Sequence, residues 1–135
     1  MRAFFLLLTL GLAVSAAASA GPQSQLKYFY CIHSGRPCKE TTPEKPVVSG
    51  NAMAVARRAL ATKDDFVGFV DAQDTTLQFK AEDGEAILVD LPDPKLQGSY
   101  STHLDRAQAL KLIDGLSAPL ARYRAQLKLK FAKWQ

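Results

Sequence analysis

The middle of the chain alternates apolar and polar side chains with a period of two residues. In the run 75–80, apolar Leu77 and Phe79 alternate with polar Gln78 and Lys80. A strand with this alternation turns one face to the core and the other to water. The run therefore predicts a β-strand in a sheet that has one wet face.

Two further runs favour strands on either side of it, at 66–70 and 86–90. Breaks of four residues, rich in Asp, Glu and Gly, separate the three runs at 71–74 and 82–85. Breaks of this composition between β-prone runs are typical of hairpin turns. The three runs thus predict an antiparallel meander.

Two outer segments are also expected to form strands. The run 26–32 is aromatic and β-branched, which favours a strand. The segment 91–94 contains Pro92 and Pro94, which cannot donate to a sheet, so we expect it to end the preceding strand. The segment 97–104 then returns as an edge strand.

Two helices are predicted, each with a capping residue at its start. Asn51 precedes good helix formers and predicts a helix over 51–62. Asp105 predicts a second helix over 105–114, and Gln108 stands three residues on, where a capping box requires it.

The C-terminal segment fits two periods. Apolar residues recur at helical steps of three and four: Leu116, Leu120, Tyr123, Leu127, Phe131 and Trp134. The run 127–131 alternates like a strand instead. Ser117 as N-cap and Pro119 in the first turn favour a helix over 117–130. Together the elements predict an α+β fold, a small antiparallel sheet packed with two or three helices.

The first twenty residues have the pattern of an export signal. Arg2 precedes an apolar stretch of about a dozen residues, too short to span a bilayer, which needs about twenty. Small residues follow and end at Ala18-Ser19-Ala20, as at a signal-peptide cleavage site. We expect 1–20 to be removed and 21–135 to form a single α+β domain, without stable membrane insertion, in the periplasm or the medium.

An oxidising compartment would let the two cysteines of the chain pair. Cys31 and Cys38 enclose six residues, and a disulfide closing so short a loop stabilises a fold by about 2.5 kcal/mol. A redox or metal-binding thiol pair is the alternative. Because the spacing matches neither the usual redox motif nor a zinc knuckle, we expect a structural disulfide.

Charge is unevenly distributed along the chain. Cleavage would remove Arg2 and lower the formal charge from +4 to +3, whereas residues 64–93 hold nine acidic side chains against the single Lys80. Opposite charges either neutralise each other in the fold or leave an acidic face for a basic partner. The candidate partner-binding residues are those of the two predicted turns: Asp71, Asp74, Glu82, Asp83 and Glu85.

No pattern in the sequence indicates catalysis, a metal or a cofactor. His33 and His103 are the only histidines and neither lies in a catalytic motif, and the acidic turns lack the spacing of a calcium loop. Basic residues are not joined by stacking aromatics, which argues against a nucleic-acid partner. We therefore expect a non-enzymatic protein that binds another protein.

Four stretches of the segment 68–116 stand out: Gly68-Phe69-Val70-Asp71, Thr76-Leu77-Gln78-Phe79, Val89-Asp90-Leu91-Pro92 and Gly98-Ser99-Tyr100-Ser101. Through these stretches the segment resembles small bacterial immunity proteins that neutralise an antibacterial effector. The resemblance implies a periplasmic inhibitor that binds a cell-wall or membrane-directed toxin and blocks its active site. Together with the acidic turns, we expect the partner to be a basic toxin or an envelope hydrolase. An envelope ligand-binding or assembly protein is the alternative, and self-association stays open.

Overall fold

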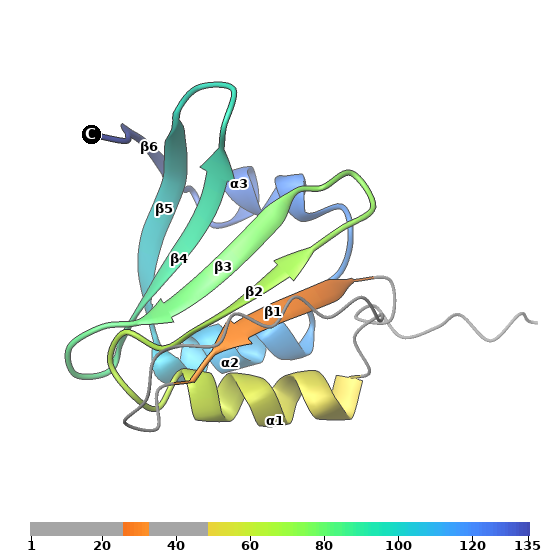
Figure 1. Cartoon of the computed structure of the whole chain (residues 1–135), viewed down its shortest axis with the longest axis vertical. Coiled ribbons are helices and arrows are strands. Elements are labelled where there is room, and N and C mark those ends of the chain that lie inside the picture. Colours follow the sequence, from red (N-terminus) through yellow and green to blue (C-terminus); the bar gives the residue numbers. More distant parts are fainter. Residues whose placement is uncertain (1–25, 33–48) are drawn as a thin grey trace, which may run out of the picture.

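Six strands form one antiparallel sheet in the computed structural model, which describes residues 26–32 and 49–135. Strands that follow one another in sequence are also neighbours in the sheet (Figure 1). They are β1 (Lys27–Cys31), β2 (Phe66–Val70), β3 (Thr76–Ala81), β4 (Ala86–Asp93), β5 (Gly98–Asp105) and β6 (Lys130–Lys133). The predicted α+β class and the antiparallel meander are confirmed.

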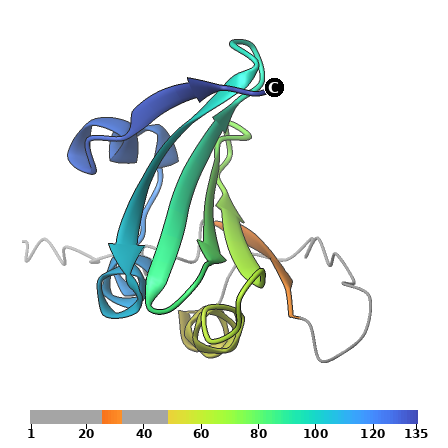
Figure 2. The same ribbon diagram turned by 90° about the vertical axis from the view of Figure 1, so that its left-hand side faces the viewer.

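The alternation in β3 decides which face of the sheet is covered. Leu77, Phe79 and Ala81 are buried, while Gln78 and Lys80 remain partly exposed. Two helices pack on the buried face, α1 (Ser49–Ala59) and α2 (Arg106–Asp114), and Figure 2 shows them end-on and side by side. The wet face predicted from the sequence is therefore the face without these helices.

Small side chains on α1 let it approach the sheet closely. Ala52, Ala56 and Ala59 are fully buried in the same cluster as Phe69 and Phe79, whose rings meet edge to face with centroids 6.1 Å apart. Burial of this apolar surface is the main force holding helices on a sheet. The helix begins at Ser49, two residues before the predicted start, so Asn51 lies inside it and is not its cap.

The second helix follows its prediction. The Gln108 N–H donates to Asp105 Oδ1 at 2.7 Å, and Gln108 Oε1 accepts the Asp105 N–H at 3.0 Å. This reciprocal capping box fixes the point where β5 becomes α2.

The predicted end of the fourth strand is wrong. β4 continues through Pro92 to Asp93, because its pairing with β5 extends to Asp93 and Gly98, whereas its pairing with β3 stops at Asp90. Beyond that point β4 has a neighbour on one side only, so the missing N–H of Pro92 removes no bond toward β3. The strand predicted over 97–104 is present as β5, but β6 pairs with its half Gly98–Ser101, so within the described sheet β5 forms the edge only beyond Ser101.

The predicted helix over 117–130 is also wrong. The segment forms the short 3-10 helix η2 (Leu120–Arg122), the single turn α3 (Tyr123–Gln126) and then β6. Lys128 has a positive φ of 53°, a conformation that a helix interior does not accept. Leu120 and Tyr123 have helical spacing because both side chains are buried from the short turns η2 and α3. The alternation near the end of the chain belongs to the strand β6.

Cys31 is fully buried at the end of β1. Cys38, the predicted signal peptide and His33 lie outside the described residues.

Candidate functional site

The five acidic residues proposed for partner binding do not form one surface. Asp71 and Asp74 belong to the turn between β2 and β3, whereas Glu82, Asp83 and Glu85 belong to the turn between β3 and β4. The two turns stand at opposite ends of the six-residue strand β3, which makes them about 20 Å apart. The two groups must therefore be considered separately.

Asp71 is a structural residue of its turn. Its side chain is 5% exposed, and its Oδ1 accepts the N–H groups of Gln73 and Thr75, both at 3.0 Å. Its Oδ2 accepts the N–H of Leu120 at 2.8 Å. The carboxylate is thus occupied inside the fold and presents no charge to a partner.

Asp74 is exposed in the same turn, with a positive φ of 60°. Its backbone N–H donates to the carbonyl of Asp71 at 3.1 Å. Asp is one of the few residues that accept this backbone conformation readily. The backbone conformation of the turn is therefore enough to explain why Asp occupies position 74, without a role in partner binding.

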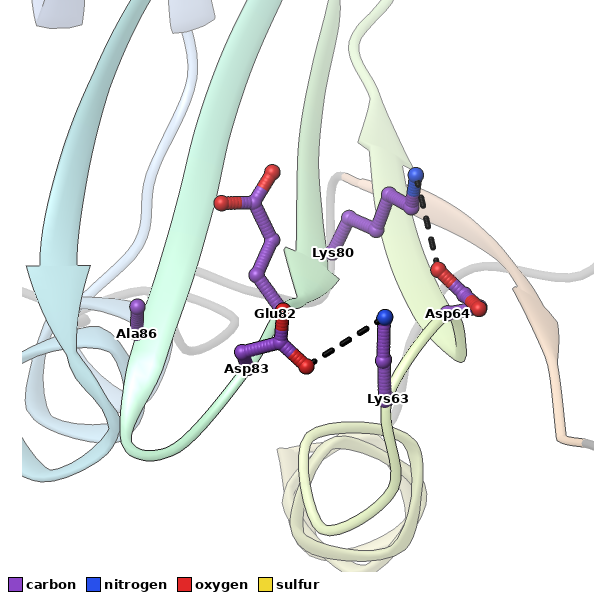
Figure 3. A pocket seen from close by; sticks show the side chains of 6 residues that line it. All are labelled: Lys63, Asp64, Lys80, Glu82, Asp83 and Ala86. Carbon is purple, nitrogen blue, oxygen red and sulfur yellow. Dashed lines mark ion pairs between the residues drawn. The ribbon is translucent and has the colours of Figure 1, made fainter.

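The other three acidic residues lie in a cluster of charges, which we name the charged end of the sheet; Figure 3 shows the part of it around Glu82 and Asp83. Four ion pairs define it: Lys63 with Asp83 at 3.3 Å, Lys80 with Asp64 at 3.9 Å, His103 with Glu82 at 2.8 Å and Arg106 with Glu85 at 3.5 Å. These residues come from the α1–β2 connection, from β3 and its turn, from β5 and from the start of α2. The fold therefore gathers here charges that are far apart in sequence.

A shallow hollow of about 340 Å³ opens at the charged end. Its lining is almost entirely charged and includes both ion pairs drawn in Figure 3, with Ala86 at its margin. Glu82, which follows the end of β3, is part of this lining and also pairs with His103 at 2.8 Å. The lining suits charged and polar groups of a ligand, not apolar ones.

The charged end keeps a negative balance. Four carboxylates, those of Asp64, Glu82, Asp83 and Glu85, face the three cations Lys63, Lys80 and Arg106, which leaves a formal charge of −1 with His103 neutral. The sequence left two possibilities, neutralisation of opposite charges in the fold or an acidic face for a basic partner. Each applies in part, since the charges partly neutralise each other and an acidic excess remains.

The ion pairs of the charged end are open to solvent. The side chains of Lys63 and Asp83 are 57% and 89% exposed. The hydrogen bond that Lys63 donates to Asp83 is the main reason why the pKa of Lys63 lies above its ordinary value, so this lysine stays charged. Exposed pairs of this kind contribute little to stability, at most about 1 kcal/mol. Their members can therefore exchange partners at low cost when another charged surface arrives.

The basic members of the charged end could not be found from the sequence. Lys80 was visible as a polar residue of an alternating strand, but Lys63, His103 and Arg106 carried no signal of proximity to the acidic turn. The one local hint is the capping box, because an N-cap at Asp105 starts α2 at Arg106, beside the β3–β4 turn.

A second hollow, of about 390 Å³, lies on the helix side of the molecule, lined by α2, Gly115, Tyr123 and Gln126. Burial acts to raise the pKa of Tyr123, but hydrogen bonds from Arg122 and Ser117 outweigh it and hold the pKa below its ordinary value. The phenol oxygen accepts the Ser117 N–H at 3.1 Å. This tyrosine therefore serves to hold the turn before η2.

Within residues 26–32 and 49–135, no group of three or more His, Cys, Asp or Glu stands close enough to hold a metal ion. No helix of this part of the chain is long and apolar enough to cross a bilayer. Comparison with protein-family models, with curated proteins and with solved structures gave no match to this chain.

Proposed function

We propose that the chain is an exported, non-catalytic binding protein that neutralises a toxin or effector in the periplasm by contact, as an immunity or inhibitor protein does. Its N-terminal segment has the composition of a signal peptide. The charged end of the sheet is the contact surface in this proposal, narrowed from five acidic residues to Glu82, Asp83 and Glu85 with their basic neighbours. The partner is a protein with a basic surface.

One observation carries the proposal: an acidic excess held in exposed, exchangeable ion pairs. Asp83 and Glu85 are 89% and 72% exposed, so their charges act on an approaching molecule through water. A negative balance of this kind speeds encounter with a basic partner, and the basic neighbours fix the register once contact is made.

A disulfide between Cys31 and Cys38 belongs to the same proposal, since it needs an oxidising compartment. Cys31 is fully buried at the end of β1, where reductants have little access. Protein purified from the envelope and unfolded in denaturant should take up no alkylating reagent before reduction, and alkylation of the unfolded protein without reduction would contradict the disulfide.

Affinity capture from the envelope fraction tests the function. Wild-type protein and a D83K/E85K variant are used as bait, at low and at moderate salt, with mass spectrometry of what is retained. The variant D74K/D114K is the matched control, because it changes net charge equally at two exposed positions outside the charged end.

The expected result is a basic toxin or envelope hydrolase that wild-type and D74K/D114K retain and D83K/E85K loses. A partner retained equally by all three baits would show that the contact surface lies outside the charged end. Retention of structural envelope proteins instead would favour the alternative of an assembly protein.

A further inference from the structure

The last strand of the chain leaves one edge of the sheet open. β6 pairs only with β5 in the described sheet, and all four of its residues, Lys130–Lys133, are exposed. It covers the half of β5 that runs from Gly98 to Ser101, while the charged end lies at the other half, near His103. The two surfaces are therefore separate.

Backbone groups on the outer side of β6 point to solvent. The Trp134 N–H donates to the carbonyl of Gln97 at 2.8 Å, across from β5. In an antiparallel pair, hydrogen-bonding groups of successive residues point alternately toward and away from the neighbour. The N–H and C=O groups of Phe131 and Lys133 thus face outward, as a strand accepting another strand presents them.

An aromatic ring flanks this edge on each face of the sheet. The Phe131 ring lies over Gly98, where an added Cβ would come within 2.5 Å of it, and its centroid is 5.1 Å from that of Tyr100. On the other face, Trp134 Nε1 donates to Ser99 Oγ at 2.9 Å. Both rings are held in place yet remain 42% and 51% exposed. Ordered, exposed aromatics of this kind are the usual anchors of an interface.

The charge at this edge selects the incoming strand. Lys128, Lys130 and Lys133 are exposed, no acidic residue occurs in residues 115–135, and no ion pair within the described part of the chain includes these lysines. Edge lysines oppose pairing with a second copy, because the same charges would meet. They attract a strand that carries carboxylates.

We propose that β6 accepts an extended acidic segment of a partner protein, which adds to the sheet as a further strand. The outward groups of Phe131 and Lys133 supply the backbone hydrogen bonds, the lysines pair with carboxylates of the segment, and the rings of Phe131 and Trp134 cover it from both faces. This proposal is independent of the one for the charged end: β6 would bind an acidic segment, whereas the charged end would bind a basic protein surface.

The chain contains a single tryptophan, so Trp134 emission reports directly on this edge. The probe is a capped peptide of about eight residues, the length of an ordinary strand, in which Val and Glu alternate. A peptide alternating Val and Lys is the matched control. Titration of the full chain with the acidic peptide should shift Trp134 emission with saturation and weaken at higher salt, and the basic peptide should give no shift.

Variants separate charge from backbone pairing. K130E/K133E should weaken binding of the acidic peptide at least about tenfold, while K27E/K111E, which makes the same charge change at exposed lysines away from β6, should leave it unchanged. Lys133→Pro and Lys133→Ala both remove the charge, but only proline removes the outward N–H, which is not used toward β5. Binding should be clearly weaker for Lys133→Pro, provided that both variants unfold in urea like wild type. If either Lys133 variant unfolds differently from wild type, the comparison of K130E/K133E with its control variant tests the proposal instead.

Three outcomes would overturn the proposal. They are an absent or unsaturable response to the acidic peptide, an equal response to the basic peptide, and a Trp134 shift that appears on raising the protein concentration alone. The last would assign the edge to a second copy of the chain.

Discussion

The carboxylate of Asp71 accepts the backbone N–H of Leu120 at 2.8 Å, across 49 positions of sequence. The bond ties the β2–β3 turn to the segment that leads from α2 to β6. Asp71, which the sequence suggested as a partner-binding residue, is thus buried and connects two parts of the fold. The proposed binding surface lies at the opposite end of β3.

Removal of the Asp71 carboxylate should destabilise the protein strongly. Asp71→Ala leaves three backbone N–H groups without their acceptor, and we expect the free energy of unfolding to fall by about 3 kcal/mol, since bonds to charged groups are worth about 1.5–3 kcal/mol. Urea unfolding measures the change. Asp74→Asn, in the exposed part of the same turn, should stay within about 0.5 kcal/mol of wild type. Equal effects at the two positions would show that the three hydrogen bonds to the Asp71 carboxylate contribute nothing measurable to stability.

Gly68 and Phe29 should be energetically coupled. The ring of Phe29 lies where a Cβ on Gly68 would stand, and its atoms are the nearest to that position. Gly68→Ala should therefore cost about 2 kcal/mol by overpacking, and adding Phe29→Ala should recover part of that cost. A double-mutant cycle by urea unfolding measures the coupling.

Gly98 provides the contrast to this pair. Both the Phe131 ring and the backbone oxygen of Ala132 lie within 3 Å of its added Cβ, so Phe131→Ala should rescue Gly98→Ala poorly. Strictly additive effects in the Gly68 cycle, or full rescue at Gly98, would contradict the observed packing.

The Asp105 cap should be worth about 1 kcal/mol, the usual cost of replacing an N-cap by alanine. Asp105→Ala removes the acceptor of the Gln108 N–H, whereas Asp105→Ser keeps an acceptor and should preserve most of the stability. Thermal unfolding followed by circular dichroism distinguishes them. Equal loss in both variants would mean that the charge of Asp105, not its capping bond, is what matters.

Asp90 should make folding more favourable as the pH falls. Burial raises the pKa of Asp90 above its ordinary value of 3.8, and the hydrogen bond from Ser99 only partly offsets this. The folded protein therefore holds this proton more tightly than the unfolded chain, so the stability from Asp90 is fully present below pH 3.8 and is lost as pH rises through the folded pKa.

Asp90→Asn should accordingly be more stable than wild type at about pH 7, and the difference should shrink toward about pH 4. Urea unfolding across this range measures it, with Asp114→Asn on the exposed end of α2 as control. A difference that stays constant with pH would show that Asp90 is not the titrating group.

Sequence patterns predicted the fold best where neighbouring residues alone determine a structural feature. The alternation around Leu77 and Phe79 predicted the wet and buried faces, and Asp105 with Gln108 predicted the start of α2. Both signals are local, because a period of two or a cap at fixed spacing needs no distant partner.

Prediction failed where distant contacts decide the structure. The segment 117–130 has helical spacing, but the Asp71 carboxylate holds Leu120, Lys128 turns the chain with a positive φ, and β5 offers an unpaired edge to β6. Pairing with an existing sheet outweighs the modest preference of a short segment for helix.

The candidate site could be predicted only in part for the same reason. The acidic turns were visible in the sequence, but their separation along β3 and the approach of Lys63, His103 and Arg106 follow from the sheet register and the placement of the helices. Charge along a sequence shows which residues can attract a partner, and only the fold shows which of them act together.

The most direct test of the central claim, binding through the charged end, is the association rate constant of the captured partner as a function of ionic strength. For wild type and D74K/D114K it should fall steeply with salt, and for D83K/E85K it should start about tenfold lower and depend little on salt, because steering by exposed charge acts mainly on association. The same rate and the same salt dependence in all three proteins would contradict the claim.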